Sequence, residues 1–195
     1  LLVDVRRLHL LFRLGDAGQH AHQAADAAEL LDLAQLISEI IEIGLCVVSV
    51  RALERVERRS ILVRPASSTV SAYCTQLTTL TQADVDAGVP LADACQTLIT
   101  AYKSRERVFA SFGDYDRRLF ESNCAAYGIA YPFGATHLNV KNLAAIVYGW
   151  SREAGMPAML KRAGLPLEGV HHRGGDDAWN IAGLLCHFLR PLRPG

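Results

Sequence analysis

The stretch of sequence that decides the fold is His171-His172-Arg173-Gly174-Gly175-Asp176-Asp177-Ala178-Trp179-Asn180. Two histidines and two aspartates lie on either side of a glycine pair, and an amphipathic helix is predicted to follow over residues 178–189. Two interpretations are open. In one, Asp176 caps the helix through its carboxylate and the histidines lie on an exposed turn. In the other, an aspartate binds a divalent metal and a nearby histidine deprotonates a water molecule, because metal-assisted phosphodiester hydrolysis needs both groups.

Two further acidic positions are candidates for chemistry. Asp114 and Asp116 lie in residues 111–120, where a predicted strand passes into a predicted helix, and ligands collect at such strand ends in α/β sheets. The ordinary alternative is that one or both aspartates cap the helix. Asp4 interrupts the apolar run of residues 1–5, where an unpaired buried carboxylate is costly. A bound metal would remove that cost, and so would exposure at the end of the chain.

The composition predicts one globular domain over residues 1–195. Half of the residues are hydrophobic and 21% are charged, which is enough apolar surface to bury a core. The 20 basic and 20 acidic residues give a formal net charge of zero, so the chain lacks the overall basic field of many nucleic-acid-binding proteins. Binding to nucleic acid would therefore rest on bound metal or on local basic patches, and the candidates are Arg58-Arg59, Lys103 with Arg105 and Arg107, Arg117-Arg118, and Lys161-Arg162.

The cysteines and the apolar runs indicate a cytoplasmic protein without a membrane partner. The five cysteines are widely spaced and form no CxxC pair, which argues against a disulfide framework and against a zinc site. No apolar run approaches the roughly 20 residues that span a bilayer, and the first residues lack the pattern of a signal peptide.

Periodicity predicts an α/β fold with a mixed central sheet flanked by helices. Strands are expected at residues 1–5, 40–50, 55–63 and 108–112, and the second and third of these form an antiparallel hairpin. Helices are expected at residues 24–37, 91–102, 115–127, 140–148, 156–163 and 178–189. Thr81 and Asp84 have the spacing of a capping box at the start of a further helix.

Taken together, these motifs resemble a known family. Residues 171–182 contain the pattern HxxxxDAxNIA, and four more segments match in the expected order, at residues 39–44, 73–78, 111–119 and 137–141. The set resembles the DEDDh 3′ to 5′ exonucleases, in particular the histone-mRNA 3′ exonuclease and its bacterial relatives. The resemblance covers roughly residues 39–189.

The resemblance implies a fold, a reaction and a cofactor. The fold would be an RNase H-like mixed sheet of about five strands flanked by helices. The reaction would be hydrolysis of the terminal phosphodiester at single-stranded 3′ ends of RNA or DNA, with release of nucleoside 5′-monophosphates. The cofactors would be two divalent cations, Mg²⁺ or Mn²⁺.

Four residues take the catalytic roles that the resemblance implies. His172 would be the general base, because it precedes the last metal-binding aspartate, Asp177, by the family's five positions. Asp177 would hold the ion on the nucleophile's side, Asp116 would hold its partner, and Asp4 would bridge both. Asp176 would be the neighbouring cap.

The first motif departs from the family pattern. Arg6 stands two positions after Asp4, where the pattern requires a glutamate, and a cation there would repel a divalent metal if it pointed into the site. An alternative placement at residues 32–34 also lacks the carboxylate. Glu39 or Glu42 would replace the lost ligand if either pointed towards the site, but both are expected on the solvent-facing positions of their strand.

Residues 6–37 do not look like the family's usual connection. Their composition is compatible with a lineage-specific insertion, a substituted segment or a slip in the reading frame. Two alternatives to an active exonuclease therefore stay open: a catalytically impaired protein that binds nucleic-acid 3′ ends, and a protein-interaction domain that uses residues 24–37 as its surface.

Secondary sites are predicted around the candidate active site. Asn139 and Lys141 are expected to contact the nucleic-acid backbone. Phe112 and Trp179 would stack on a base or fill the core.

Overall fold

The computed structural model describes residues 2–6, 38–150 and 154–192. In this part of the chain the sheet has six strands in the order β4-β3-β2-β1-β5-β6. Their bounds are β1 Leu2–Arg6, β2 Glu42–Ser49, β3 Glu54–Arg64, β4 Val89–Pro90, β5 Val108–Ser111 and β6 His137–Asn139. Periodicity predicted four of these six strands and missed the two-residue β4 and the short β6, while the resemblance implied about five.

The strand directions make the sheet mixed, as predicted. β1 is antiparallel to β2, and β2 is antiparallel to β3, which confirms the predicted hairpin. β1 is parallel to β5, and β5 is parallel to β6. The strand that carries Asp4 therefore lies in the middle of the sheet, beside the strand that leads to Asp116.

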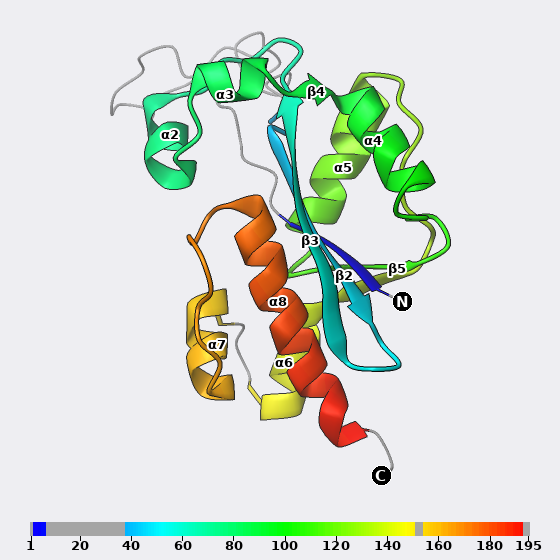
Figure 1. Ribbon diagram of the computed structural model, residues 1–195, viewed down its shortest axis with the longest axis vertical. Helices are drawn as coiled ribbons and strands as arrows, with labels where there is room; N and C mark the ends of the chain where they lie inside the picture. Colours follow the sequence, from blue (N-terminus) through cyan, green and yellow to red (C-terminus); the bar gives the residue numbers. More distant parts are fainter. Residues whose placement is uncertain (1, 7–37, 151–153, 193–195) are drawn as a thin grey trace, which may run out of the picture.

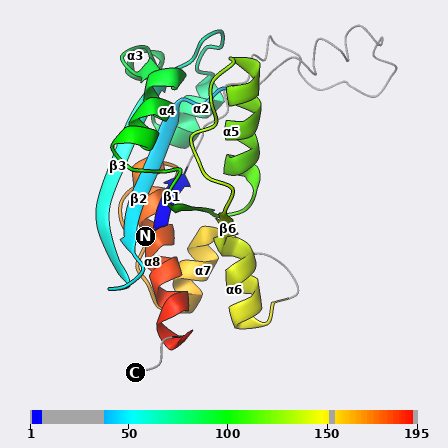
Figure 2. The same cartoon turned by 90° about the vertical axis from the view of Figure 1, so that its right-hand side faces the viewer.

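Helices cover both faces of the sheet (Figures 1 and 2). The helices are α2 Ala72–Thr78, α3 Gln82–Asp86, α4 Leu91–Thr100, α5 Tyr115–Ala126, α6 Val140–Tyr148, α7 Met156–Ala163 and α8 Gly174–Leu189, followed by the 3-10 turn η1 Arg190–Leu192. Both views show α4 and α5 in the upper half of the molecule and α6, α7 and α8 in the lower half. The predicted helix at residues 24–37 lies outside the described residues.

The β2 strand explains the two-sided core. Leu45 and Val47 pack with α4 and α5, whereas Cys46 and Val48 pack with α6, α7 and α8. Because successive side chains of a strand point to opposite faces, a strand covered on both faces is apolar over most of its length. Burial on both faces therefore explains the dense β-branched run that predicted this strand.

Two local signals at helix ends are confirmed. Thr81 caps α3, and the side chain of Asp84 accepts a hydrogen bond from the Thr81 backbone, so the predicted capping box is present. The α5 helix ends just before Gly128, which has φ +63°, a conformation that favours glycine. No helix in the described part of the chain is long and apolar enough to cross a membrane.

Candidate functional site

A turn immediately before α8 brings two histidine rings together. The rings of His171 and His172 stack with centroids 3.9 Å apart and planes 22° from parallel. His172 has φ +77°, a region that non-glycine residues seldom adopt. Such a conformation persists where surrounding contacts hold it, so the contacts of this turn decide where the two imidazoles lie.

Asp177 is the carboxylate that orients the turn. Its side chain is 2% exposed, and its Oδ1 lies 2.9 Å from Nδ1 of His171. The backbone N–H of His172 donates to both carboxylate oxygens at 3.3 Å. Asp177 belongs to the first turn of α8, where the helix dipole favours a negative charge. The structure therefore brings together His172 and Asp177, as the sequence predicted, and adds His171.

The prediction that Asp176 caps α8 is wrong. The helix begins at Gly174, four residues before the predicted start, and Asp176 lies inside its first turn. The two glycines favour a loop in isolation, but the backbone N–H of Gly174 donates to the buried Glu42 of β2 at 2.9 Å. This contact holds the start of the helix despite the low helix propensity of glycine.

Asp176 instead fixes the segment that precedes the turn. Its carboxylate accepts hydrogen bonds from the Val170 backbone N–H at 2.8 Å and from Arg58 at 2.9 Å. Asn180, which is buried, accepts from the backbone N–H of Glu168 at 2.9 Å and donates to the Glu168 carbonyl at 2.8 Å. The sequence analysis did not predict a role for Asn180, although Asn180 is the asparagine of the HxxxxDAxNIA pattern.

Glu42 supplies the acceptor at the start of α8. It is fully buried and accepts the Gly174 backbone N–H at 2.9 Å and the Ser60 hydroxyl at 2.5 Å. Arg173 forms an ion pair with it at 3.6 Å. The expectation that Glu42 faces solvent is wrong, because α8 covers this face of β2. Its oxygens are already used to hold the turn.

Glu39 is buried too, which corrects the same expectation. Its carboxylate accepts hydrogen bonds from the backbone N–H groups of Ala66 and Ser68 and from the Tyr127 hydroxyl. Burial alone raises the pKa of Glu39, but the hydrogen bonds from Ser68, Tyr127 and Ala66 together lower it below its ordinary value. Glu39 therefore anchors the loop after β3.

The second acidic motif is held by the neighbouring strand β6. Asp116 is buried, with 6% exposure, in the first turn of α5. The loop before it is fixed by Asn139, whose Oδ1 accepts from the Gly113 N–H at 3.1 Å and whose Nδ2 donates to Asp114 at 3.3 Å. His137 lies 2.7 Å from the Ser111 hydroxyl. These loop-holding roles of Ser111 and His137 were missed, and only the recurrent segment at residues 137–141 hinted at them.

His137 sits in a partly buried, mixed electrostatic environment. Burial lowers its pKa, and the nearby Arg117 lowers it further, while Asp114 at 3.7 Å raises it. The pKa of His137 therefore lies below the ordinary value for histidine. Burial therefore favours the neutral imidazole beside the loop that carries Asp116.

Asp4 is placed by the register of β1. Its Cα partners are Cys46 in β2 and Ala110 in β5, and both partners belong to the core beneath α8. Arg6 ends the strand opposite Gly44. The strand of the predicted first motif thus lies beside β5, which leads to the second motif, and contacts α8, which carries the third, while its side chains lie outside the described part of the structure. The alternative placement at residues 32–34 lies outside it as well.

The predicted nucleic-acid contacts have structural roles of their own. Asn139 caps α6 by accepting the backbone N–H groups of Lys141 and Asn142, in addition to holding Gly113. The Lys141 ammonium lies 5.8 Å from the centre of the partly buried Phe112 ring. A contact of Asn139, Lys141 or Phe112 with nucleic acid stays a prediction.

The donor set fits a divalent cation in part. Among the described residues, the donor atoms of His171, His172 and Asp177 all lie within 4.8 Å of one another. Asp116 adds a second buried carboxylate, and hard cations prefer such oxygens. The carboxylate oxygens of Glu39 and Glu42 are engaged in the hydrogen bonds described above.

The family follows from these motifs and from the match of the whole domain. The model of the exonuclease family RNase_T matches residues 28–185. This chain belongs to the exonuclease family. Similar curated proteins are the 3′-5′ exonuclease Snipper of Drosophila melanogaster, 29% identical over 64% of this chain and 51% of that protein, and the 3′-5′ exoribonuclease 1 of Rattus norvegicus, 27% identical over 80% of this chain and 48% of that protein. The chain spans about half the length of these relatives.

Solved structures show the same fold. The nuclease domain of 3′hExo, a DEDDh family member bound to rAMP, superposes with a TM-score of 0.79 at 21% identity, over 97% of this chain and 92% of that chain. A 3′-exonuclease structure on recognition of the histone mRNA stem-loop gives a TM-score of 0.80 at 20% identity, over 97% and 63% of the two chains. The predicted RNase H-like fold and the resemblance to DEDDh exonucleases are confirmed.

Proposed function

We propose that this exonuclease domain hydrolyses the terminal phosphodiester at single-stranded 3′ ends of RNA or DNA and releases nucleoside 5′-monophosphates. The observation that carries the proposal is the turn that presents His172 beside the buried Asp177 at the start of α8. The 3′-5′ exonuclease activity named for its relatives supports the direction of hydrolysis. The widely spaced cysteines favour a cytoplasmic location.

In the proposed reaction, His172 accepts a proton from the attacking water. The water oxygen forms a bond to phosphorus, the bond between phosphorus and the 3′ oxygen breaks, and the departing oxygen is protonated by solvent. An imidazole suits this role because its ordinary pKa lies close to neutral pH. Asp177 keeps the His172 backbone in its unusual conformation, and the stacked His171 ring restricts the movement of His172.

Asp4, Asp116 and Asp177 are the residues proposed to hold Mg²⁺ or Mn²⁺. Bound cations would neutralise the phosphate and lower the pKa of the attacking water. Asp116 and Asp177 are suited to this role, because both are buried carboxylates in the first turn of a helix.

One observation favours a second function, the binding of 3′ ends without hydrolysis. Arg6 stands where the family pattern has a glutamate, and the carboxylate oxygens of Glu39 and Glu42 are engaged in the hydrogen bonds described above. A site with one fewer carboxylate would bind the second cation weakly, and cleavage would slow more than binding.

The test is nucleotide release from 5′-labelled single-stranded RNA and DNA, in Mg²⁺, in Mn²⁺ and in EDTA. We expect shortening from the 3′ end with either metal and none in EDTA. His172→Ala is expected to lower the rate by a factor of about 10² to 10⁴, the usual contribution of a general base.

Asp177→Asn and Asp93→Asn make a matched pair for the carboxylate. Both aspartates lie in the first turn of a helix, but Asp93 lies on α4, on the opposite face of the sheet. We expect cleavage to be lost in the first variant and kept in the second. Binding of labelled strands without nucleotide release in any metal would establish the second function and overturn the first.

A further inference from the structure

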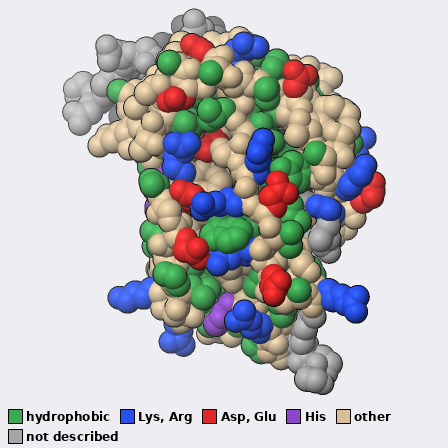
Figure 3. All heavy atoms as spheres, in the orientation of Figure 1, with side chains coloured by type: hydrophobic (Ala, Val, Ile, Leu, Met, Phe, Trp, Pro, Cys, Tyr) green, Lys and Arg blue, Asp and Glu red, His purple; other side chains and the backbone are tan. Residues whose placement is uncertain are grey.

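A line of arginines runs along the seam between α8 and β3. The α8 residues Asp176, Trp179 and Gly183 recur at helical spacing, on a side of the helix away from Asp177, and Arg190 follows directly after the helix. Arg55 and Arg58 reach this side from β3. We call Arg58, Trp179, Arg55 and Arg190, in their order along the seam, the arginine strip. Figure 3 shows Lys and Arg side chains around an apolar patch on the face that α8 presents in Figure 1.

The centre of the strip is an indole between two guanidinium groups. The Arg55 guanidinium lies 4.1 Å from the centre of the Trp179 ring, and that of Arg58 lies 5.7 Å from it. Gly183 lies beside this arrangement, and a Cβ there would be in ordinary van der Waals contact with Arg55 Nη1, at 3.4 Å. The Trp179 N–H donates to Glu168 at 2.9 Å, which fixes the plane of the indole.

Acidic neighbours orient the arginines. Arg55 pairs with Glu168 at 2.8 Å and Arg58 pairs with Asp176 at 2.9 Å, and each contact uses Nη1, one of the three guanidinium nitrogens. The Arg58 side chain is 46% exposed, and Arg190 is exposed at the far end of the helix. Arg55 and Arg58 are therefore held by ion pairs, with Arg58 the more exposed of the two, while Arg190 faces solvent.

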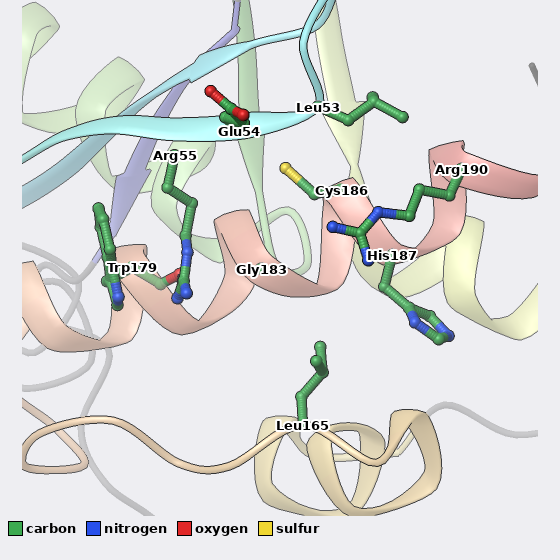
Figure 4. A pocket seen from close by; sticks show the side chains of 9 residues that line it. All are labelled: Leu53, Glu54, Arg55, Leu165, Trp179, Gly183, Cys186, His187 and Arg190. Atoms are coloured by element: carbon green, nitrogen blue, oxygen red, sulfur yellow. The ribbon is translucent and has the colours of Figure 1, made fainter.

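Two hollows lie along the strip. One, of about 280 Å³, is lined by Arg58, Thr79 and Arg173, next to the turn that carries His172. The other, of about 350 Å³, is lined by Arg55, Trp179 and Arg190, as Figure 4 shows. The strip thus leads away from the candidate active site along the whole of α8.

We propose that the arginine strip binds the part of a single-stranded nucleic acid that lies upstream of the 3′ terminus. Guanidinium groups bind phosphates through paired hydrogen bonds, and bases stack on tryptophan and on guanidinium planes. From Asp176 to Arg190, α8 rises about 20 Å, which matches about six stacked nucleotides at about 3.4 Å each. The direction in which the nucleic acid lies, with its 3′ end at the candidate active site, rests on the proposed function, whereas binding to the strip does not.

The test is equilibrium binding of 5′-labelled single-stranded RNA and DNA of 12 nucleotides, followed by fluorescence anisotropy in EDTA. The variant is Arg58→Gln with Arg190→Gln. Each lost phosphate contact lowers the slope of log K against log salt by about 0.7, so the slope should fall by about 1.4. At 0.1 M salt that loss corresponds to about 25-fold weaker binding.

The matched control is Arg64→Gln. It removes one exposed positive charge at the end of β3, beside α4 and α5 on the opposite face of the sheet. We expect its affinity and its salt slope to stay within a factor of about two of the unmodified chain. Circular dichroism establishes that each variant is folded, and Arg190→Gln alone changes only an exposed side chain.

The affinity of a trinucleotide distinguishes binding at the arginine strip from binding at the candidate active site. A trinucleotide is too short to occupy both, so its affinity should not change in the Arg58→Gln, Arg190→Gln variant. Equal losses for the trinucleotide and the 12-mer, equal losses in the control, or an unchanged salt slope would each overturn the proposal. The binding measurement is made in EDTA and so does not depend on metal. A chain that binds 12-mers through the strip but does not cleave them in Mg²⁺ or in Mn²⁺ would contradict the proposed function and leave the arginine strip standing.

Discussion

Glu42→Gln tests whether a buried carboxylate on β2 holds the candidate catalytic turn. The substitution keeps the size of the side chain and one acceptor oxygen for the Gly174 N–H, while the Ser60 hydroxyl can turn to accept from the new amide. The charge is lost, and with it the pairing to Arg173 at 3.6 Å and the interaction with the positive end of α8. The hydrogen bonds also change from charge-assisted to neutral, and neutral ones are about half as strong.

The expected cost is about 2 kcal/mol in the free energy of unfolding. A hydrogen bond to a charged group contributes about 1.5–3 kcal/mol against about 1 kcal/mol for a neutral one, and the helix dipole adds up to about 1 kcal/mol. For a domain of this length, that loss corresponds to a Tm lower by about 4–8 °C. Activity should fall as well, because the start of α8 carries both Asp177 and the turn with His172.

Urea unfolding followed by circular dichroism measures the stability, with Glu106→Gln as the control. Glu106 is exposed, so its change should stay within about 0.5 kcal/mol. A Glu42→Gln chain as stable as the control would refute the reasoning, because it would mean that the buried charge contributes nothing to the position of α8.

Three further changes have expected outcomes. His137 has a lowered pKa in the folded chain, so the unfolded chain binds more protons below about pH 6.5. The unfolding free energy should therefore fall as the pH decreases from about 6.5. His137→Gln should reduce this dependence on pH in denaturation measured between about pH 5 and 7.5. Gly169→Ala places a Cβ 2.4 Å from the Asp176 carboxyl carbon at φ +80°, so calorimetry should show a loss of about 1–3 kcal/mol, and an unchanged Tm would contradict it. Phe120→Ala empties a fully buried site that contacts Phe109 and Phe133 edge-on, and chemical unfolding should show a loss of about 3–5 kcal/mol; a loss below about 1 kcal/mol would mean that the core refills the space.

The arginine strip also changes how the zero net charge is understood. The basic patches predicted from neighbouring positions in the sequence were pairs such as Arg58-Arg59, yet successive residues of a strand point to opposite faces. Arg58 faces α8 and bonds Asp176, whereas Arg59 acts on Tyr102 on the α4 side, where burial raises the pKa of Tyr102 to about 12 and the Arg59 charge opposes that rise. The surface that gathers arginines therefore combines residues more than 100 positions apart.

The sequence by itself determined the fold class, the β2–β3 hairpin, most helices and the pairing of His172 with Asp177. These features depend on local causes, namely apolar periodicity, turn residues and short motifs whose members lie within a few positions of one another. Only the tertiary structure decided that α8 starts at Gly174, that Glu42 is the acceptor for its first N–H, and that Trp179 lies between Arg55 and Arg58. In each of these cases, the deciding contact joins α8 to the β2–β3 hairpin. A contact across more than 100 residues leaves no period or spacing in the sequence from which it could be predicted.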